Sequence, residues 1–166
     1  TLFYSDWGPS EVGCDLWTAS VNENPPHVER LKSLEGCAWH PAISPDGRWL
    51  LFMWNGNPVI APYPSLEHFQ PISTMPGSFP VWHPDGESIF YLDSWGTLTT
   101  VEIRTEPTIS FSPYEVAQWG PFDSLDIFPD GRRFLVIKAD LVEPITELVV
   151  VENWFEELKR KAPPSR

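Results

Sequence analysis

The hydrophobic positions of this chain fall in short runs that come in pairs, and a Pro-Asp-Gly tripeptide separates the two runs of a pair. The stretches CAWHPAISPDGRWLLFMW, GSFPVWHPDGESIFYLD and DSLDIFPDGRRFLVIKA all follow this pattern, with aromatic and β-branched residues in the second run. Proline presets φ for a tight turn, Asp can bond the turn's backbone, and Gly supplies a positive φ. Each tripeptide is therefore predicted to be a hairpin corner: Pro45, Asp46 and Gly47; Pro84, Asp85 and Gly86; Pro129, Asp130 and Gly131.

The corners recur at intervals of 39 residues (Pro45 to Pro84) and 45 residues (Pro84 to Pro129). A period of roughly 40 residues that carries only strand signals is typical of β-propeller blades, each a four-stranded antiparallel sheet. We therefore expect an all-β fold, a partial β-propeller of about four antiparallel four-stranded blades within a single domain of residues 1–166. The predicted blades span about residues 1–34, 37–73, 78–118 and 122–152.

The remaining apolar runs supply the other strands, which gives three, four, four and three strands in the four blades. The first blade then lacks its innermost strand and the last lacks its outermost. A short C-terminal helix is expected at about 154–161, because Asn153 can cap it, Glu156 completes a capping box, and Lys159, Arg160 and Lys161 lie at its carbonyl end. The additional strands are predicted at 1–7, 15–21, 27–32, 58–63, 69–73, 98–103, 113–117 and 146–154.

Composition and charge narrow the class of partner. With 42% hydrophobic residues the chain can bury a core, and its 19 Pro and 10 Gly are spread along the length, as many turns require. A formal net charge of −12 disfavours nucleic acid. No apolar run approaches the roughly 20 residues of a membrane span, so membrane insertion is not expected. Cys14 and Cys37 lack the spacing of a zinc site, and we expect two buried free thiols.

The corner segments resemble the TolB-like β-propeller repeats of bacteria, whose blades carry a PxWSPDGxxIxF-type signature. AISPDGRWLLF follows that pattern, PVWHPDGESIFY has His83 in place of Ser, and DIFPDGRRFLV has Phe128 there. The run that ends in NWFEELKR resembles the C-terminal end of propeller modules fused to bacterial signalling proteins, including serine/threonine kinases and transcription regulators. The resemblance implies an interaction platform in a sensor protein, with a lean towards the periplasm. Rings of this family usually have about six blades, so this chain is either a segment or closes differently.

A search for catalytic patterns finds no nucleophile elbow, HExxH, P-loop or GxGxxG motif, and we expect neither an enzyme nor a cofactor or metal. His27, His40, His68 and His83 are not at ligand spacing. His40 and His83 precede prolines at the ends of inner strands, where a channel-facing role and a hydrogen-bonded structural role are both open. The three corner Asp residues are expected to serve turn geometry on separate blades, well apart.

The tryptophans provide the candidate site. The predicted blade geometry places Trp7, Trp39, Trp54, Trp95 and Trp119 at or near the face opposite the corners. It places Trp17, Trp49, Trp82 and Trp154 in strands or the C-terminal tail, as core residues. The first five either form an aromatic contact surface or fill gaps between blades. We expect a non-enzymatic module that binds a protein or peptide through this loop face. The alternative is a carbohydrate-binding or carbohydrate-active propeller, since Trp suits sugar stacking. The open blade ends also favour a homodimer.

Overall fold

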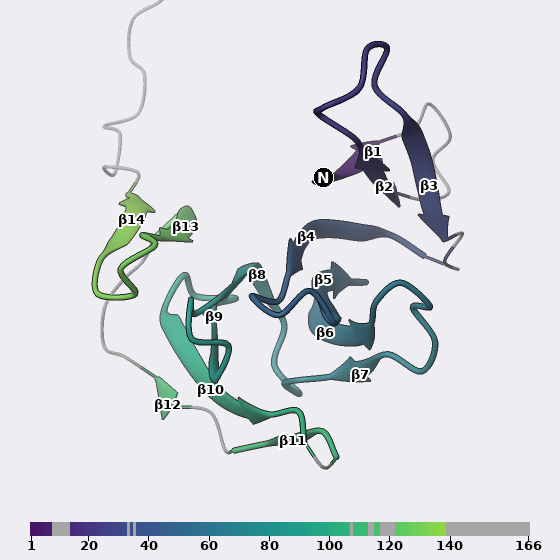
Figure 1. Cartoon of the computed structure of the whole chain (residues 1–166). Coiled ribbons are helices and arrows are strands. Elements are labelled where there is room, and N and C mark those ends of the chain that lie inside the picture. The colour runs from purple at the N-terminus through teal and green to yellow at the C-terminus, as the bar shows by residue number, and fades with distance from the viewer. Residues whose placement is uncertain are drawn as a thin grey trace, which may run out of the picture.

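The computed structural model describes residues 1–7, 14–32, 34, 36–106, 108–112, 115–116 and 122–138, and these residues form an all-β fold of four antiparallel sheets (Figure 1). The expected C-terminal helix and the strand predicted at 146–154 lie outside the described residues. The described part contains no helix that is long and apolar enough to cross a membrane. The all-β, partial-propeller prediction is confirmed.

The four sheets follow one another along the chain. The first has the order β1 (Leu2–Trp7), β2 (Cys14–Ala19), β3 (Val28–Lys32). The second has the order β4 (Ala38–Ile43), β5 (Trp49–Trp54), β6 (Asn57–Pro62), β7 (Gln70–Pro71). The third has β8 (Gly77–Trp82), β9 (Ser88–Asp93) and β10 (Leu98–Arg104), with both β11 (Ser110–Phe111) and β12 (Glu115–Val116) paired to β10. The fourth pairs β13 (Ser124–Ile127) with β14 (Phe134–Ile137).

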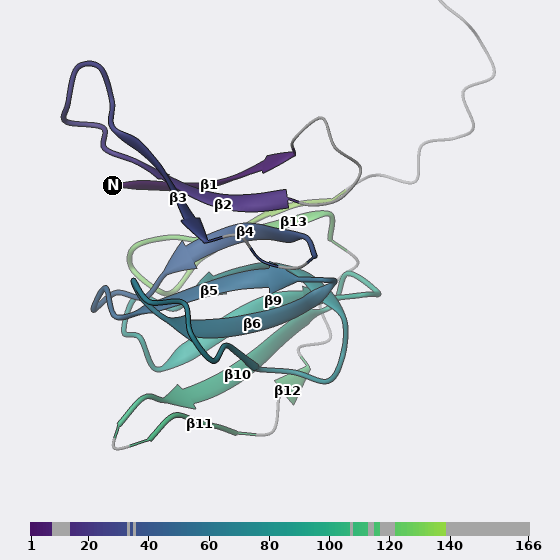
Figure 2. The same cartoon turned by 90° about the vertical axis from the view of Figure 1, so that its right-hand side faces the viewer.

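The sheets are stacked as blades around an arc (Figures 1 and 2). The strand that opens each later blade contacts its neighbours: β4 packs against β1 and β8, and β8 packs against β13. The outermost strand β7 of the second blade is shorter than the strand predicted at 69–73. Proline offers no amide to a strand ladder, and Pro71 ends β7.

Buried side chains fill the spaces between blades. Strand β5 is buried on both faces because a blade covers each of them: Leu50 and Phe52 belong to the cluster shared with the first blade, and Leu51 to the cluster shared with the third. This double burial explains why WLLFMW is a continuous apolar run rather than an alternating one. Between the third and fourth blades, Phe90 and Phe134 meet edge to face with centroids 4.9 Å apart.

The inner strands β4 and β8 share a bulge that the repeat pattern did not predict. His40 and Phe79 occupy equivalent positions, each before a proline, and both have φ of 51°. The register of each strand with its partner shifts at this point. The two rings stack with centroids 4.4 Å apart, which ties the second and third blades together at their inner strands.

Cys14 and Cys37 form a disulfide, so the prediction of two free thiols was wrong. The two residues are 23 positions apart in sequence, but both β1 and β2 pack against β4, and the Cα atoms lie 4.4 Å apart. That distance suits a disulfide. The bridge joins the three-stranded first blade to the segment that enters the second.

The three Pro-Asp-Gly corners have one backbone geometry. In the second corner the Gly86 amide donates to the His83 carbonyl oxygen (2.9 Å), Gly86 has φ of 77°, and Asp85 Oδ1 accepts from the Glu87 amide (2.8 Å). The His83 amide also donates to the Ser88 carbonyl, which closes the hairpin (2.9 Å). The same bonds recur at Ser44, Asp46, Gly47, Arg48 and Trp49 in the first corner, and at Phe128, Asp130, Gly131, Arg132 and Arg133 in the third.

Replacing Gly86 with Val is expected to destabilise the fold by about 1–3 kcal/mol, because a β-branched residue is strained at positive φ. Space does not limit this site, since an added Cβ would lie 3.7 Å from the nearest atom, Cδ of Pro45. Gly86→Asn is the matched control, because Asn tolerates the left-handed region and should lose clearly less. Urea denaturation of the three proteins measures both values, and equal midpoints for Gly86→Val and the parent would contradict the corner geometry.

Candidate functional site

The residue before the corner proline is Ser44, His83 or Phe128, and the first two both contact the Asp of their own corner. Ser44 Oγ donates to Asp46 Oδ1 (2.6 Å) and accepts from the Trp49 amide (2.9 Å). His83 Nδ1 lies 2.7 Å from Asp85 Oδ1, and its Nε2 lies 3.1 Å from the Gly131 carbonyl oxygen in the fourth blade. His83 is thus a hydrogen-bonded structural residue that joins two corners.

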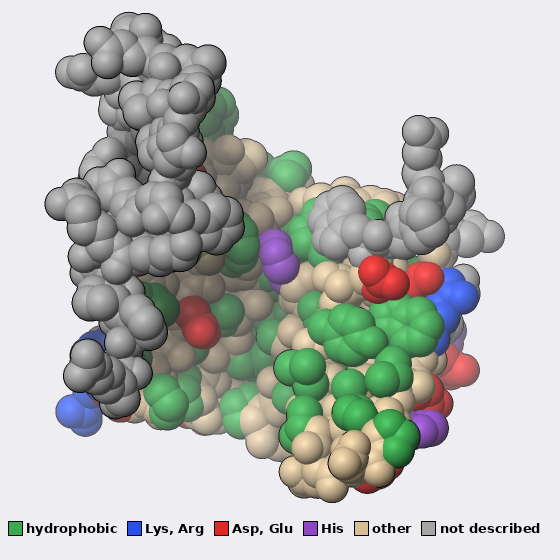
Figure 3. Space-filling model, turned by 90° about the horizontal axis from the view of Figure 1, so that it is seen from above, with side chains coloured by type: hydrophobic (Ala, Val, Ile, Leu, Met, Phe, Trp, Pro, Cys, Tyr) green, Lys and Arg blue, Asp and Glu red, His purple; other side chains and the backbone are tan. Residues whose placement is uncertain are grey.

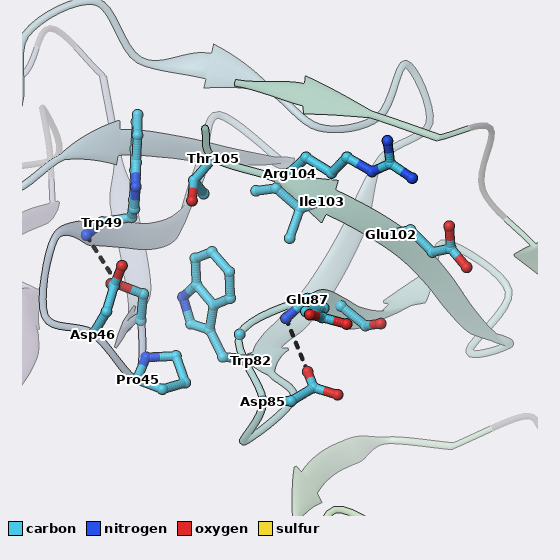
Figure 4. A pocket seen from close by; sticks show the side chains of 13 residues that line it. Pro45, Asp46, Trp49, Trp82, Asp85, Glu87, Glu102, Ile103, Arg104 and Thr105 are labelled. Atoms are coloured by element: carbon cyan, nitrogen blue, oxygen red, sulfur yellow. Dashed lines mark hydrogen bonds between the residues drawn. The ribbon is translucent and has the colours of Figure 1, made fainter. Parts of the chain in front are cut away.

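A cavity of about 730 Å³ opens beside the first two corners, between the second and third blades (Figure 4). We call it the corner cavity. Its walls come from the first corner and the start of β5, from the end of β8 with the second corner, and from the end of β10. The lining residues are Ser44, Pro45, Asp46, Trp49, Trp82, Asp85, Gly86, Glu87, Ser88, Glu102, Ile103, Arg104 and Thr105.

Two tryptophans that the sequence placed in the core border this cavity. Trp82, the last residue of β8, is only 6% exposed and belongs to the cluster between the second and third blades. Its Nε1 donates to the Ala42 carbonyl of β4 (3.2 Å), so the indole is fixed across the junction between blades. Trp49 is half-buried and packs against the same cluster. Both residues therefore support the core and also form an aromatic wall.

A chain of polar contacts holds the rim of the cavity at the first corner. The hydrogen bond from Ser44 is the main reason that the pKa of Asp46 falls to about 2, below the ordinary 3.8; burial opposes this shift, and the Arg48 amide and guanidinium add to it. Arg48 also pairs with Glu106, with Nη1 and Oε1 2.7 Å apart. This link connects the first corner to the segment that follows β10 in the third blade.

The second corner presents a further carboxylate to the cavity. Burial alone would raise the pKa of Asp85, but the Glu87 amide and His83 outweigh it and lower that pKa. Asp46 and Asp85 are thus turn residues of separate blades that line one cavity; Asp130 is not among its lining residues. No group of three or more His, Cys, Asp or Glu in the described part of the chain could hold a metal ion.

The opposite face, which we call the loop face, has a smaller cleft of about 520 Å³. It lies where two turns meet the segments that enter the next blades. At the turn between β5 and β6, the Gly77 amide donates to the Gly56 carbonyl (3.0 Å). At the turn between β9 and β10, the Phe122 amide donates to the Gly96 carbonyl (2.9 Å). We call it the loop cleft. It is lined by Gly56, Pro76, Gly77, Ser78, Asp93, Ser94, Trp95, Gly96, Phe122 and Asp123.

Trp95 is the prominent side chain of the loop cleft, and it is 76% exposed. Its backbone is fixed, because Asp93 Oδ1 accepts from the amides of Trp95 (2.8 Å) and Thr97 (2.9 Å), and the Gly96 amide closes the turn on the Asp93 carbonyl (2.9 Å). The backbone of this turn therefore needs little ordering when the side chain binds a partner.

The other predicted loop-face tryptophans differ from Trp95. Trp39 and Trp54 are half-buried, and the Trp54 ring meets Phe69 edge to face at 4.8 Å. These two residues favour the alternative in which aromatic side chains fill space between elements. The side chain of Trp7 and the whole of Trp119 lie outside what the structure describes. Of the four tryptophans assigned to strands or core, Trp17 is half-buried and Trp154 is outside the described residues.

The sequence matches no family model and no curated protein at a significant level. Solved structures do match. A putative TolB from Agrobacterium tumefaciens superposes with a TM-score of 0.59 at 17% identity, over 84% of this chain and 55% of that one. TolB from Acinetobacter baumannii gives a TM-score of 0.56 at 18% identity, over 85% of this chain and 35% of that one. A putative 6-phosphogluconolactonase from Bacteroides uniformis gives 0.53 at 16% identity, over 74% and 40%.

The fold is that of a TolB-like partial β-propeller. The chain spans between 35% and 55% of the length of these three structures. At identities of 16–18% the likeness shows the fold alone, and neighbours with different printed names share it.

The charge of Asp46 should stabilise the fold in a pH-dependent way. Its folded pKa of about 2 lies below the ordinary 3.8, so the stabilisation is complete above about pH 4 and is lost as the pH falls towards 2. Asp46→Asn keeps one oxygen acceptor but removes the charge. We expect its melting temperature to fall below that of the parent at pH 7, with the difference closing between pH 4 and 2. A difference that does not change with pH would contradict the electrostatic explanation.

Proposed function

We propose that the chain is a non-enzymatic binding module whose loop face, centred on Trp95, contacts a protein or peptide partner. The exposed indole on a turn fixed by Asp93 is the observation that carries the proposal. Large exposed aromatic side chains beside a cleft are typical of residues that dominate binding energy. The backbone of the loop cleft is held by hydrogen bonds between neighbouring blades, so little ordering is needed on binding.

The non-enzymatic part of the proposal rests on the titratable side chains, most of which already form structural hydrogen bonds within or between corners. Asp46 and Asp85 are held by their own corners, and His83 joins two corners. His40 Nδ1 is buried and has no hydrogen-bond partner among the described residues, and burial lowers its pKa. His40 stacks on Phe79 rather than on another titratable group. An acid, a base and a nucleophile that converge on one point would be needed for catalysis.

A carbohydrate ligand is the second candidate, and the same indole favours it. An exposed Trp ring can stack on a sugar face, and Ser78 and Ser94 offer hydroxyl groups in the same cleft. The experiment that tests the loop face therefore needs both peptide and oligosaccharide ligands.

We further propose that the module is part of a larger bacterial sensor or signalling protein, because apolar side chains on the first sheet and on β14 are exposed. Hydrophobic side chains gather on the first sheet, across a hollow from the other end of the arc (Figure 3). Leu2 and Val28 on the first blade are 53% and 49% exposed, and Leu135 and Ile137 on β14 are 59% and 60% exposed. Further blades would cover these ends in a longer polypeptide; in the isolated chain, a second copy would do so.

Trp95→Ala is expected to weaken partner binding strongly and leave the fold intact. Removing a side chain this exposed should change stability by no more than about 0.5 kcal/mol. Peptides selected from a displayed random library on the parent protein should bind the variant at least about thirtyfold more weakly. Isothermal titration measures the affinities and urea denaturation the stability.

Trp54→Ala is the matched control for this variant. Its ring packs on Phe69, so its loss should cost roughly 2–4 kcal/mol of stability. Selected peptides that bind Trp95→Ala as tightly as the parent would overturn the loop-face proposal. An oligosaccharide panel that yields the only Trp95-dependent ligand would replace the peptide partner with a sugar.

The isolated chain is expected to form a homodimer through its open ends. Sedimentation at micromolar concentration should show a species at twice the 18.9 kDa mass of the chain. Changing Leu2 and Val28 together to Asp should shift the population to monomer, because charges would then face the apolar surface. A parent protein that sediments as a single 18.9 kDa species would contradict the dimer.

A further inference from the structure

The His40 imidazole lies between the inner strands of the second and third blades, and one of its nitrogens has no polar partner. The ring stacks on Phe79 with centroids 4.4 Å apart and an angle of 25° between the planes. Nδ1 is buried and has no hydrogen-bond partner among the residues that the structure describes. An imidazolium carries a proton on both nitrogens, and a buried N–H without an acceptor is costly. The position therefore suits the neutral ring.

Among the described residues, the strands that pack against β4 present no charged side chain to His40. Strands β5 and β8 contain no titratable residue. The titratable residues of β1 and β2 alternate with Phe3 and Leu16, which pack towards the second blade, so they lie on the opposite face: Tyr4, Asp6 and Asp15.

Burial is accordingly the cause that acts on His40, and it lowers the pKa of this residue below the ordinary 6.5. The unfolded chain therefore takes up a proton at this position at a higher pH than the folded protein does. It follows that the stacked arrangement is fully stable above about pH 6.5 and loses stability as the pH falls below that value.

The backbone at the stack is strained on both sides. His40 and Phe79 each precede a proline and each have φ of 51°, a region that is unfavourable for residues with a side chain. Such conformations persist where the surrounding contacts hold them. The stack is a contact of this kind, because it presses the two bulges against each other across the junction between blades.

The bulge at Phe79 is directly next to the loop cleft. Gly77 and Ser78, the two residues before it, line that cleft. Gly77 pairs with Asp93 of β9, and the Asp93 carboxylate holds the turn that carries Trp95. A change at Phe79 thus reaches the Trp95 turn through one pair of neighbouring strands.

We propose that His40 is a pH-sensitive switch for the loop cleft. When its imidazole gains a proton, the stack on Phe79 opens, the start of β8 loosens and the Trp95 turn loses its fixed position. The cleft then holds a partner at neutral pH and releases it in mildly acidic surroundings. The release rests on the proposed binding function of the loop face, whereas the movement can be measured without a ligand.

The first test is NMR of the ligand-free chain between about pH 8 and about pH 5, where ordinary carboxyl groups stay mostly charged and imidazoles titrate. We expect the Gly77 amide and the Trp95 indole N–H to shift with the same midpoint as the His40 ring. His40→Phe copies the residue at the equivalent position of the third blade, so it should keep the stack and abolish both shifts. His27→Gln removes an exposed imidazole from the first blade and is the matched control, which should keep both shifts.

The second test uses peptides without histidine that are selected on the parent protein at about pH 7.5. Between about pH 7.5 and about pH 5.5, isothermal titration should show at least about a tenfold loss of affinity for the parent and less than about twofold for His40→Phe. Selected peptides that bind Trp95→Ala as tightly as the parent would contradict the loop-face function alone, because the NMR result still decides the switch.

Two results would overturn the switch. One is a Gly77 amide and a Trp95 indole that stay unchanged over this pH range, whether or not the His40 ring gains a proton. The other is a pH response that persists in His40→Phe, which would assign it to His68 or His83, since both remain in that variant. Circular dichroism at each pH checks that the variants are folded, and His40→Gln takes the place of His40→Phe if the latter is not.

Discussion

The hairpin corner is the constraint on which the rest of the structure depends. A chain that reverses direction between two strands needs one residue at positive φ, and Gly86 meets this need while Asp85 caps the amide beyond it. The first two strands of a blade are thereby fixed in register with each other. Since the corner occurs three times in phase, each later blade presents its inner strand in the same orientation to the one before it.

Contacts between neighbouring blades then join these hairpins into one structure. Trp82 bonds to the backbone of the preceding blade, and His83 to that of the following one. The close approach of His83 requires glycine at its partner, since a Cβ on Gly131 would lie 2.5 Å from Nε2. Because the indole of Trp82 spans the junction between two corners, the surface beside it is concave. The Trp82 side chain therefore contributes both to the aromatic core and to the wall of the corner cavity.

Local patterns in the sequence predict the local structure well. The corners and most strands follow from turn chemistry and alternation, which involve only neighbouring residues. The disulfide, the stacked bulges at His40 and Phe79, and the corner cavity all join residues from different blades, and spacing along one chain does not reveal such contacts. A signal for the cavity did exist: Trp82 stands where the other repeats have Ile43 and Ile127, and Trp49 where the third blade has Ser88. Two tryptophans at positions where the other repeats have smaller side chains indicate that packing between these two blades differs from packing elsewhere in the repeat.

The bridge between Cys14 and Cys37 has a consequence for how the molecule opens. The first blade is at an end of the described arc and packs on one neighbour, so it is the unit that would separate from the rest with the smallest loss of buried contacts. The disulfide ties its second strand to the entry of β4, so strand separation there also disturbs the second blade. Disulfides persist in oxidising surroundings and are reduced in the cytosol. The cooperativity of the first two blades is thus set by the redox state of the compartment, independently of any ligand.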